Sequence, residues 1–208
     1  ELVAQAVDAA MKRCKMPAGV FSLIQGGNRQ VGQALVQHPL IKAVGFTGSL
    51  AGGRALFDLC AARPEPIPFF GELGSVNPMF VMPEAVKNRA VELGKGWAGS
   101  LTMGAGQFCT NPGIAVMLDN ADSKAMIAAA SAALSEISAQ TMLTDGIADA
   151  YRSGVAAIEK TGIESVVRTT DTADRTALPN LFTVTGQAWL DHPTLHQEVF
   201  GPLGLVVL

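Results

Sequence analysis

Residues 41–50 read IKAVGFTGSL, and this stretch decides how the first third of the chain folds. The apolar run at residues 41–46 predicts a buried strand. Thr47, Gly48 and Ser49 then form a turn in front of a helical pattern that extends from residue 50 to residue 62. A further apolar run at residues 67–70 predicts the next strand. Because strands separated by a helix pair in parallel, we predict an α/β fold built on a layered sheet.

The alternation of helices and strands extends in both directions from this stretch. Helical patterns are found at residues 1–15, 30–37, 84–100, 123–139 and 145–161. Short apolar runs predict strands at residues 20–24, 79–82, 114–118, 165–169, 181–185 and 203–208. The character of the sequence changes after Asn77, so we predict two domains, at residues 1–75 and 76–208.

The composition is typical of a globular protein with a core. Of the 208 residues, 49% are hydrophobic and only 16% are charged, which excludes a disordered chain. The net charge is −3 and the basic side chains form no cluster, so neither nucleic acid nor an anionic membrane is an expected partner. The apolar runs are short and interrupted, and no segment is predicted to span a bilayer.

The cysteines and histidines predict neither a disulfide framework nor a metal site. Cys14, Cys60 and Cys109 are an odd and sparse set without CxxC spacing, which favours a reducing, cytoplasmic location. His192 and His196 are four residues apart, but they lie in a proline-containing loop. Cys14 and Cys60 each lie on the apolar side of a predicted helix and are expected to be buried.

The two ends of the sequence resemble cut ends. The chain opens at Glu1 directly in a helical pattern, without an N-cap, and it stops at Leu208 within an apolar strand. We therefore expect the chain to be the central part of a longer protein.

Cys109 is the first candidate for chemistry. It follows a glycine-rich loop, MGAG at residues 103–106, and precedes TNPG at residues 110–113, so it lies in irregular chain between a helix and a strand. Reactive groups are commonly displayed on loops that rigid elements hold in place. A thiolate also needs partly exposed, polar surroundings. The position therefore predicts a nucleophilic cysteine and not a buried one.

Glu72 is the second candidate. It follows the apolar run IPFF at residues 67–70 and precedes the flexible turn at Gly74 and Ser75. A carboxylate at such a position can act as a general base.

Ser49 is a third candidate, because the free N–H groups at a helix start favour a phosphate, although serine is also an ordinary N-cap.

Four segments in this order resemble the aldehyde dehydrogenase superfamily. They are FTGS at residues 46–49, ELG at 72–74, GQFCT at 106–110 and EVFGP at 198–202. The interval between Glu72 and Cys109 is close to the usual spacing of the family. The segments AARPEPIP at 61–68 and QFCTNPG at 107–113 are similar to one branch, the α-ketoglutarate semialdehyde (2,5-dioxovalerate) dehydrogenases and the related NADP-dependent fatty aldehyde dehydrogenases.

The resemblance implies a fold and an activity. The fold would be a partial Rossmann-type cofactor domain plus most of an α/β catalytic domain. Cys109 would attack an aldehyde and form a thiohemiacetal and then a thioester, and Glu72 would activate the water that hydrolyses it. The backbone N–H of Cys109 would form half of an oxyanion hole. Phe108 and Thr110 would contact the substrate.

The resemblance also implies a cofactor, NAD or NADP. The residues that it assigns to this cofactor are Phe46, Thr47, Gly48, Ser49, Leu73, Glu198 and Phe200. Ser49 would meet the pyrophosphate, Glu198 would hold the nicotinamide ribose, and Phe200 would pack near the ring. The full-length enzyme would be a homo-oligomer. Ser75 departs from the family, which usually has a second glycine after ELG.

Two alternatives stay open. The CoA-acylating relatives share the fold and the cysteine but lack a glutamate at the position of Glu72. The chain could also be a fragment without activity of its own, because the oxyanion-hole asparagine and the ribose-binding lysine of the family would precede Glu1. In that case its incomplete sheet would expose an edge and apolar faces.

Overall fold

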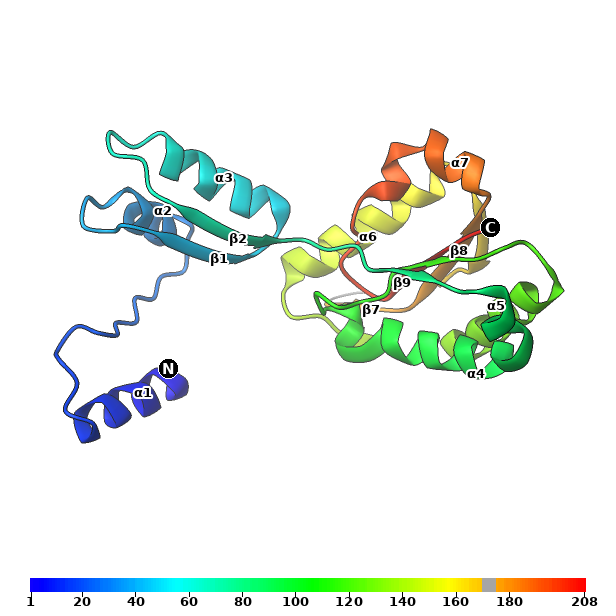
Figure 1. Cartoon of the computed structure of the whole chain (residues 1–208), viewed down its shortest axis with the longest axis horizontal. Helices are drawn as coiled ribbons and strands as arrows, with labels where there is room; N and C mark the ends of the chain where they lie inside the picture. The colour runs from blue at the N-terminus through cyan, green and yellow to red at the C-terminus, as the bar shows by residue number, and fades with distance from the viewer. Residues whose placement is uncertain (170–174) are drawn as a thin grey trace. The chain divides into compact units, whose positions relative to one another are not determined.

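The computed structural model describes residues 1–169 and 175–208. The chain divides into two compact units, Glu1–Leu73 and Gly74–Leu208 (Figure 1). The assignment of the first unit to cofactor binding and of the second to catalysis stays a prediction.

Unit 1 is built on a strand–helix–strand arrangement. Its elements are α1 (Leu2–Arg13), α2 (Gln30–Gln37), β1 (Val44–Gly48), α3 (Leu50–Ala61) and β2 (Phe69–Leu73). The strands β1 and β2 pair in parallel, with Val44 opposite Phe69 and Gly48 opposite Leu73. The parallel pairing predicted from residues 41–70 is therefore confirmed, although both strands begin two or three residues later than expected.

Small residues and a capping serine position α3 on this sheet. Gly53 is buried, and a β-carbon added there would lie 1.9 Å from a methyl group of Leu73, so a larger residue would require the Leu73 side chain to move. The Ser49 hydroxyl accepts a hydrogen bond of 3.2 Å from the Gly52 N–H and caps the first turn. Cys60 is buried near the end of α3, as predicted.

Two predictions for the beginning of the chain are wrong. Residues 20–24 form no strand, because a strand needs a neighbouring backbone to pair with and the sheet of unit 1 consists of β1 and β2. Val20 and Ile24 are instead exposed. Cys14 is also exposed, because α1, which it follows, buries none of its residues.

Large apolar side chains of unit 1 are exposed. Parallel strands are normally covered on both faces. Here the Phe70 side chain of β2 is 68% exposed, and Leu50 at the start of α3 is 62% exposed.

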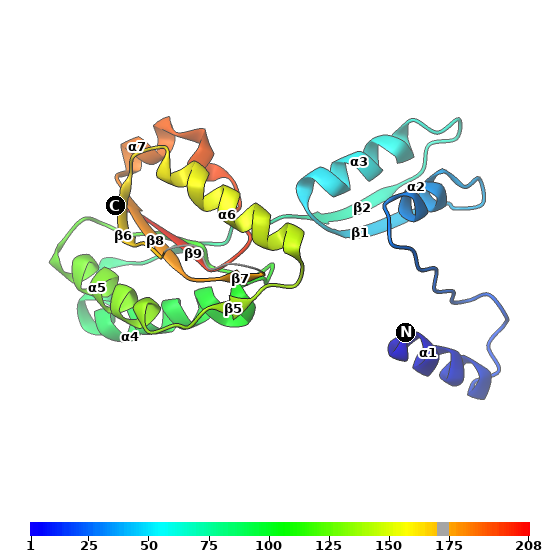
Figure 2. The same cartoon turned by 180° about the vertical axis from the view of Figure 1, so that it is seen from behind.

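Unit 2 is a three-layer structure around a five-stranded sheet (Figures 1 and 2). The strand order is β3 (Pro78–Phe80), β4 (Ile114–Val116), β9 (Leu203–Val207), β8 (Asn180–Val184) and β6 (Glu164–Val167). The helices α4 (Pro83–Thr102) and α5 (Ala121–Ser135) cover one face. The other face carries α6 (Asp145–Glu159) and α7 (Gly186–Asp191).

The remaining elements of unit 2 are short. They are the turn η1 (Met103–Gly106), the two-residue strands β5 (Gln140–Thr141) and β7 (Thr176–Ala177), and the turn η2 (Pro193–His196). The sequence predicted neither these nor α7. The pairs from β3 to β8 are parallel, whereas β6 pairs antiparallel with β8.

Two apolar clusters hold the layers of unit 2 together. Successive side chains of a strand point to opposite faces, so each central strand supplies both clusters. Leu181 and Val206 belong to the cluster under α4 and α5, while their neighbours Phe182 and Leu205 belong to the cluster under α6. Strands with two buried faces explain the continuous apolar runs seen in the sequence.

Among the described residues, no helix is both long and apolar enough to cross a membrane.

We predict that α4 and α5 depend on a glycine at their contact. A β-carbon at Gly94 would lie 2.4 Å from the Met126 carbonyl oxygen and 3.0 Å from the Ala129 β-carbon. Gly94→Ala should therefore lower the free energy of unfolding by about 1–3 kcal/mol, measured by urea denaturation. Gly96 of the same helix faces open space. Gly96→Ala is the control and should be neutral or stabilise by up to about 1 kcal/mol; equal losses in both variants would contradict the prediction.

Candidate functional site

The Cys109 loop lies at the amino ends of three neighbouring parallel strands. Residues 74–77 lead into β3, residues 107–113 lead into β4, and residues 197–202 lead into β9. Because β3, β4 and β9 are adjacent and point the same way, the segments that precede them meet at one edge of the sheet. Cys109 and Glu198, far apart in sequence, are brought to the same edge in this way.

A left-handed turn delivers the chain from α4 to Cys109. Gly104, Ala105 and Gly106 all have positive φ, at 57°, 57° and 68°. The left-handed backbone conformation of Ala105 costs about 1–2 kcal/mol, and burial of Ala105 in the core of unit 2 helps to offset that cost. Such strain is common at functional sites.

Gly106 permits a close backbone contact with the segment before β9. A β-carbon added at Gly106 would lie 2.3 Å from the Gly201 carbonyl carbon. The Asn111 amide joins the same elements, because its Nδ2 donates to the carbonyl oxygens of Gly106 at 2.8 Å, Leu101 at 3.1 Å and Gly201 at 3.4 Å. The Cys109 loop is thus attached to α4 on one side and to the β9 segment on the other.

Cys109 itself is exposed, as predicted, whereas its backbone is held. Its carbonyl oxygen accepts hydrogen bonds from the Ser75 hydroxyl and from Asn77 Nδ2, the latter at 2.7 Å. The neighbouring Gln107 also links two segments, since its Nε2 donates to the Gly104 carbonyl and its Oε1 accepts from the Leu143 N–H. The loop therefore displays a free thiol on a fixed main chain.

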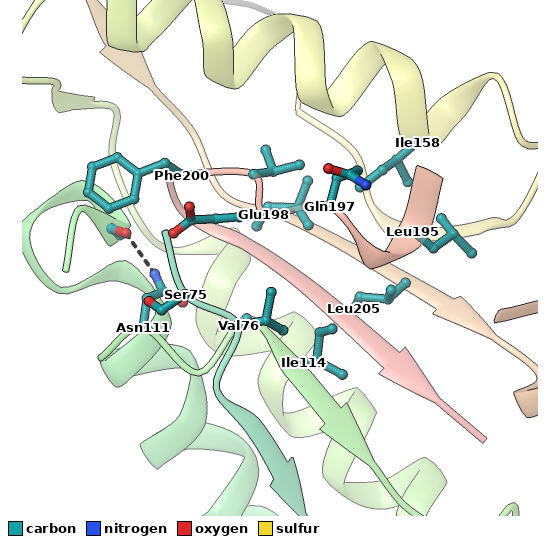
Figure 3. A pocket seen from close by; sticks show the side chains of 14 residues that line it. Ser75, Val76, Asn111, Ile114, Ile158, Leu195, Gln197, Glu198, Phe200 and Leu205 are labelled. Atoms are coloured by element: carbon teal, nitrogen blue, oxygen red, sulfur yellow. Dashed lines mark hydrogen bonds between the residues drawn. The ribbon is translucent and has the colours of Figure 1, made fainter. Parts of the chain in front are cut away.

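A pocket opens beside this loop (Figure 3). Its polar lining includes Ser75, Asn111 and Glu198, and its apolar lining includes Val76 and Phe200. Gly74, at a φ of 67°, makes room for the Glu198 carboxylate, because a β-carbon there would lie 2.8 Å from Glu198 Oε2. Two predicted cofactor residues thus line a pocket that Asn111 of the Cys109 loop also lines. Phe108 and Thr110 flank Cys109 and are exposed.

The other predicted site residues lie together in unit 1. Phe46, Thr47 and Gly48 end β1, and Glu72 and Leu73 end β2. Thr47 lies opposite Glu72 in the parallel register. The Phe46 ring lies against Gly48, where a β-carbon would be 2.6 Å from it. Ser49 and the first residues of α3 are exposed, so the start of the helix is accessible from solvent.

The family profile of the aldehyde dehydrogenases, described as "Aldehyde dehydrogenase family", matches residues 1–208. The chain belongs to this family. The α-ketoglutaric semialdehyde dehydrogenase 2 of Azospirillum brasilense is 44% identical to it over 213 residues, covering 100% of this chain and 40% of that protein. The α-ketoglutaric semialdehyde dehydrogenase of Acinetobacter baylyi is 40% identical over 210 residues, with the same coverage. This aldehyde dehydrogenase family chain thus spans 40% of the length of both relatives.

A solved structure supports the fold. The NAD-dependent benzaldehyde dehydrogenase of Corynebacterium glutamicum matches with a TM-score of 0.79 over 96% of this chain and 44% of that one, at 22% identity. The predicted α/β, aldehyde dehydrogenase-like fold is confirmed.

Among residues 1–169 and 175–208, no group of three or more His, Cys, Asp or Glu is arranged to hold a metal ion.

Sequence reasoning missed the residues that hold this family member's Cys109 loop. In the sequence, Ser75 is visible only as a departure from the glycine usual in the family, and no motif assigns a role to Asn77 or Asn111. Asn111 stands two residues after the cysteine, where a side-chain amide can satisfy the carbonyls of an irregular loop. That position was the available signal. Nothing local in the sequence indicates that Ser75 and Asn77 reach the Cys109 carbonyl, because the contact spans more than thirty residues.

Tyr151 of α6 packs against the segment that precedes β9. Its ring lies against Gly201, where a β-carbon would be 2.3 Å from it, and its hydroxyl donates to the Leu178 carbonyl at 2.7 Å. The hydroxyl also accepts from Asn180 Nδ2 at 3.0 Å. Burial raises the pKa of Tyr151 well above its ordinary value, and the hydrogen bond from Asn180 opposes that shift.

We predict that ionisation of Tyr151 destabilises the fold at high pH. The pKa of the Tyr151 phenol is higher in the folded protein than its unfolded value of 10.0. The stability that the neutral phenol contributes is therefore fully present below pH 10, and it is lost as the pH rises above 10 toward the folded pKa. The urea midpoint should therefore fall above about pH 10, and less steeply in Tyr151→Phe. Tyr151 is the only tyrosine, so ultraviolet absorbance reports its ionisation alone. Equal alkaline slopes in both proteins would refute this assignment.

Proposed function

We propose that the chain is the thiol-bearing part of an NAD(P)-dependent dehydrogenase that oxidises α-ketoglutaric semialdehyde to the carboxylic acid. The observation that carries the proposal is the exposed Cys109 thiol on a loop whose carbonyl and flanking backbone are held by Ser75, Asn77 and Asn111. The substrate is proposed from the names of two relatives that are 44% and 40% identical over the whole chain.

The reaction begins at the Cys109 sulfur. As the thiolate, it attacks the aldehyde carbon, and the carbonyl oxygen becomes the oxyanion of a thiohemiacetal. The backbone N–H of Cys109 would donate a hydrogen bond to that oxyanion. Loss of a hydride from the carbon re-forms the carbonyl and leaves a thioester on Cys109. Water then adds to the thioester, and the carboxylic acid and the free thiol are released.

The residues of unit 1 fit a dinucleotide. Thr47, Gly48 and Ser49 lead from β1 into α3, and the accessible N–H groups at the helix start suit a pyrophosphate. In unit 2, Glu198 and Phe200 line a pocket and offer a carboxylate for ribose hydroxyls and an aromatic face. When bound, NAD or NADP supplies the acceptor for the hydride.

Glu72 is the proposed general base for thioester hydrolysis. It is exposed near the end of β2, on a strand held by its parallel pairing with β1. A carboxylate held on a strand can take a proton from water as the water attacks. The CoA-acylating alternative would need no such base, so Glu72 favours hydrolysis.

We predict that Cys109→Ser in the full-length protein lowers NAD(P)H formation from α-ketoglutaric semialdehyde by at least about a thousandfold, because the nucleophile is lost. Cofactor binding, measured by fluorescence quenching, should be retained. The matched control is Cys14→Ser, which removes an exposed thiol on unit 1 and should leave turnover unchanged. A Cys109→Ser protein with more than a tenth of wild-type turnover would disprove the mechanism.

We predict that Glu72→Gln stalls the enzyme at the thioester. Rapid mixing should show a burst of NAD(P)H equal to the active sites, followed by steady turnover slower by about 10²–10⁴-fold. Mass spectrometry should find the acyl group on Cys109. Glu65, an exposed carboxylate that pairs with Lys42, provides the control variant Glu65→Gln, with normal turnover. Preferred transfer of the acyl group to CoA, or faster turnover with a fatty aldehyde, would contradict the proposed acceptor or substrate.

A further inference from the structure

The Cys109 carbonyl oxygen has two side-chain donors, which come from one short segment. The Ser75 hydroxyl and Asn77 Nδ2 both donate to it, and Asn77 Nδ2 also donates to the Asn111 carbonyl at 3.1 Å. Side chains two residues apart in extended chain point to the same side, so Ser75 and Asn77 face the Cys109 peptide together. We propose that Ser75 is a positioning residue for the Cys109 nucleophile, an inference that rests on the proposed function.

The contact acts on the orientation of Cys109 and adds little to the anchoring of the loop. The loop is already attached by Asn111, which reaches three carbonyl groups, and by Trp97, whose Nε1 donates to the Pro112 carbonyl at 2.7 Å. The Ser75 bond instead acts at residue 109, where the carbonyl and the thiol-bearing side chain share one α-carbon. Fixing the carbonyl leaves the thiol mainly its side-chain rotation, which lowers the entropy lost in reaching the attacking geometry.

A glycine at position 75, which is usual in the family, has no hydroxyl to donate to the Cys109 carbonyl. The Ser75 contact is therefore a feature of this chain.

The test uses the full-length protein with Cys14→Ser, so that Cys109 is the only exposed thiol of this chain, since Cys60 is buried. The hydroxyl is removed by Ser75→Ala and, as a second variant, by Ser75→Gly, and it is retained by Ser75→Thr. Ser135→Ala is the control, because the exposed Ser135 hydroxyl also donates to a backbone carbonyl, that of Ser131 at 2.8 Å, within α5.

The readouts are the rate of Cys109 alkylation by iodoacetamide as a function of pH, followed by peptide mass spectrometry, and kcat and KM for the aldehyde. We expect Ser75→Ala and Ser75→Gly to lower the alkylation rate at about pH 7 by about fivefold, the effect of one ordinary hydrogen bond. The kcat should fall by a similar factor with little change in KM. Ser75→Thr and Ser135→Ala should match the parent, and all variants should keep its urea midpoint.

Two results would overturn the proposal. One is wild-type alkylation across the pH range in both Ser75→Ala and Ser75→Gly. The other is an equal loss in Ser75→Thr, which would mean that the hydroxyl is not the active feature. Failure of the proposed function would look different, because Cys109→Ser would then still oxidise the aldehyde, while the alkylation rates would continue to report the role of Ser75.

Discussion

The parallel order of β3, β4 and β9 is the constraint on which the Cys109 site depends. Three neighbouring strands that point the same way bring their leading segments to one edge of the sheet. The segment at residues 74–77, the Cys109 loop and the Glu198 segment meet there for this reason alone. Of these strands, β4 and β9 supply side chains to the apolar clusters on both faces, so the helices on either side hold this edge in place.

Close backbone contact then fixes the detail at that edge. Gly106 lies against Gly201, the Tyr151 ring packs on Gly201, and Asn111 Nδ2 donates to the carbonyl oxygens of both glycines. No larger residue than glycine fits at either contact point. The positive φ of Ala105 adds local strain, which the packed core below it can support. The thiol can therefore be exposed while its main chain stays ordered, which is the requirement for a positioned nucleophile.

The predicted site residues of unit 1 lie at the carboxyl ends of its strands, whereas the Cys109 site of unit 2 lies at the amino ends of its strands. Ser49 follows β1, and Glu72 and Leu73 end β2, so the predicted site residues of unit 1 lie at the carboxyl ends of a parallel pair. Crevices at the carboxyl ends of parallel strands are where open α/β sheets generally bind ligands. The glycines of α3 allow the helix to lie close to β2, and the capping hydroxyl of Ser49 sets where the helix begins.

Local patterns in the sequence were enough to predict the α/β class, most helices and strands, and Cys109 and Glu72 as candidate site residues, because periodicity and motifs are local properties of the chain. The same patterns gave wrong predictions at residues 20–24, where an apolar run has no strand to pair with, and at Cys14, where the helix before it buries no residue. The folded structure was needed to show that β4 lies beside β9, that β6 is antiparallel, and that Ser75 and Asn77 bond to the Cys109 carbonyl. Those features depend on pairings between distant segments, and such pairings are set by packing and hydrogen bonding across the sheet, which no local pattern encodes.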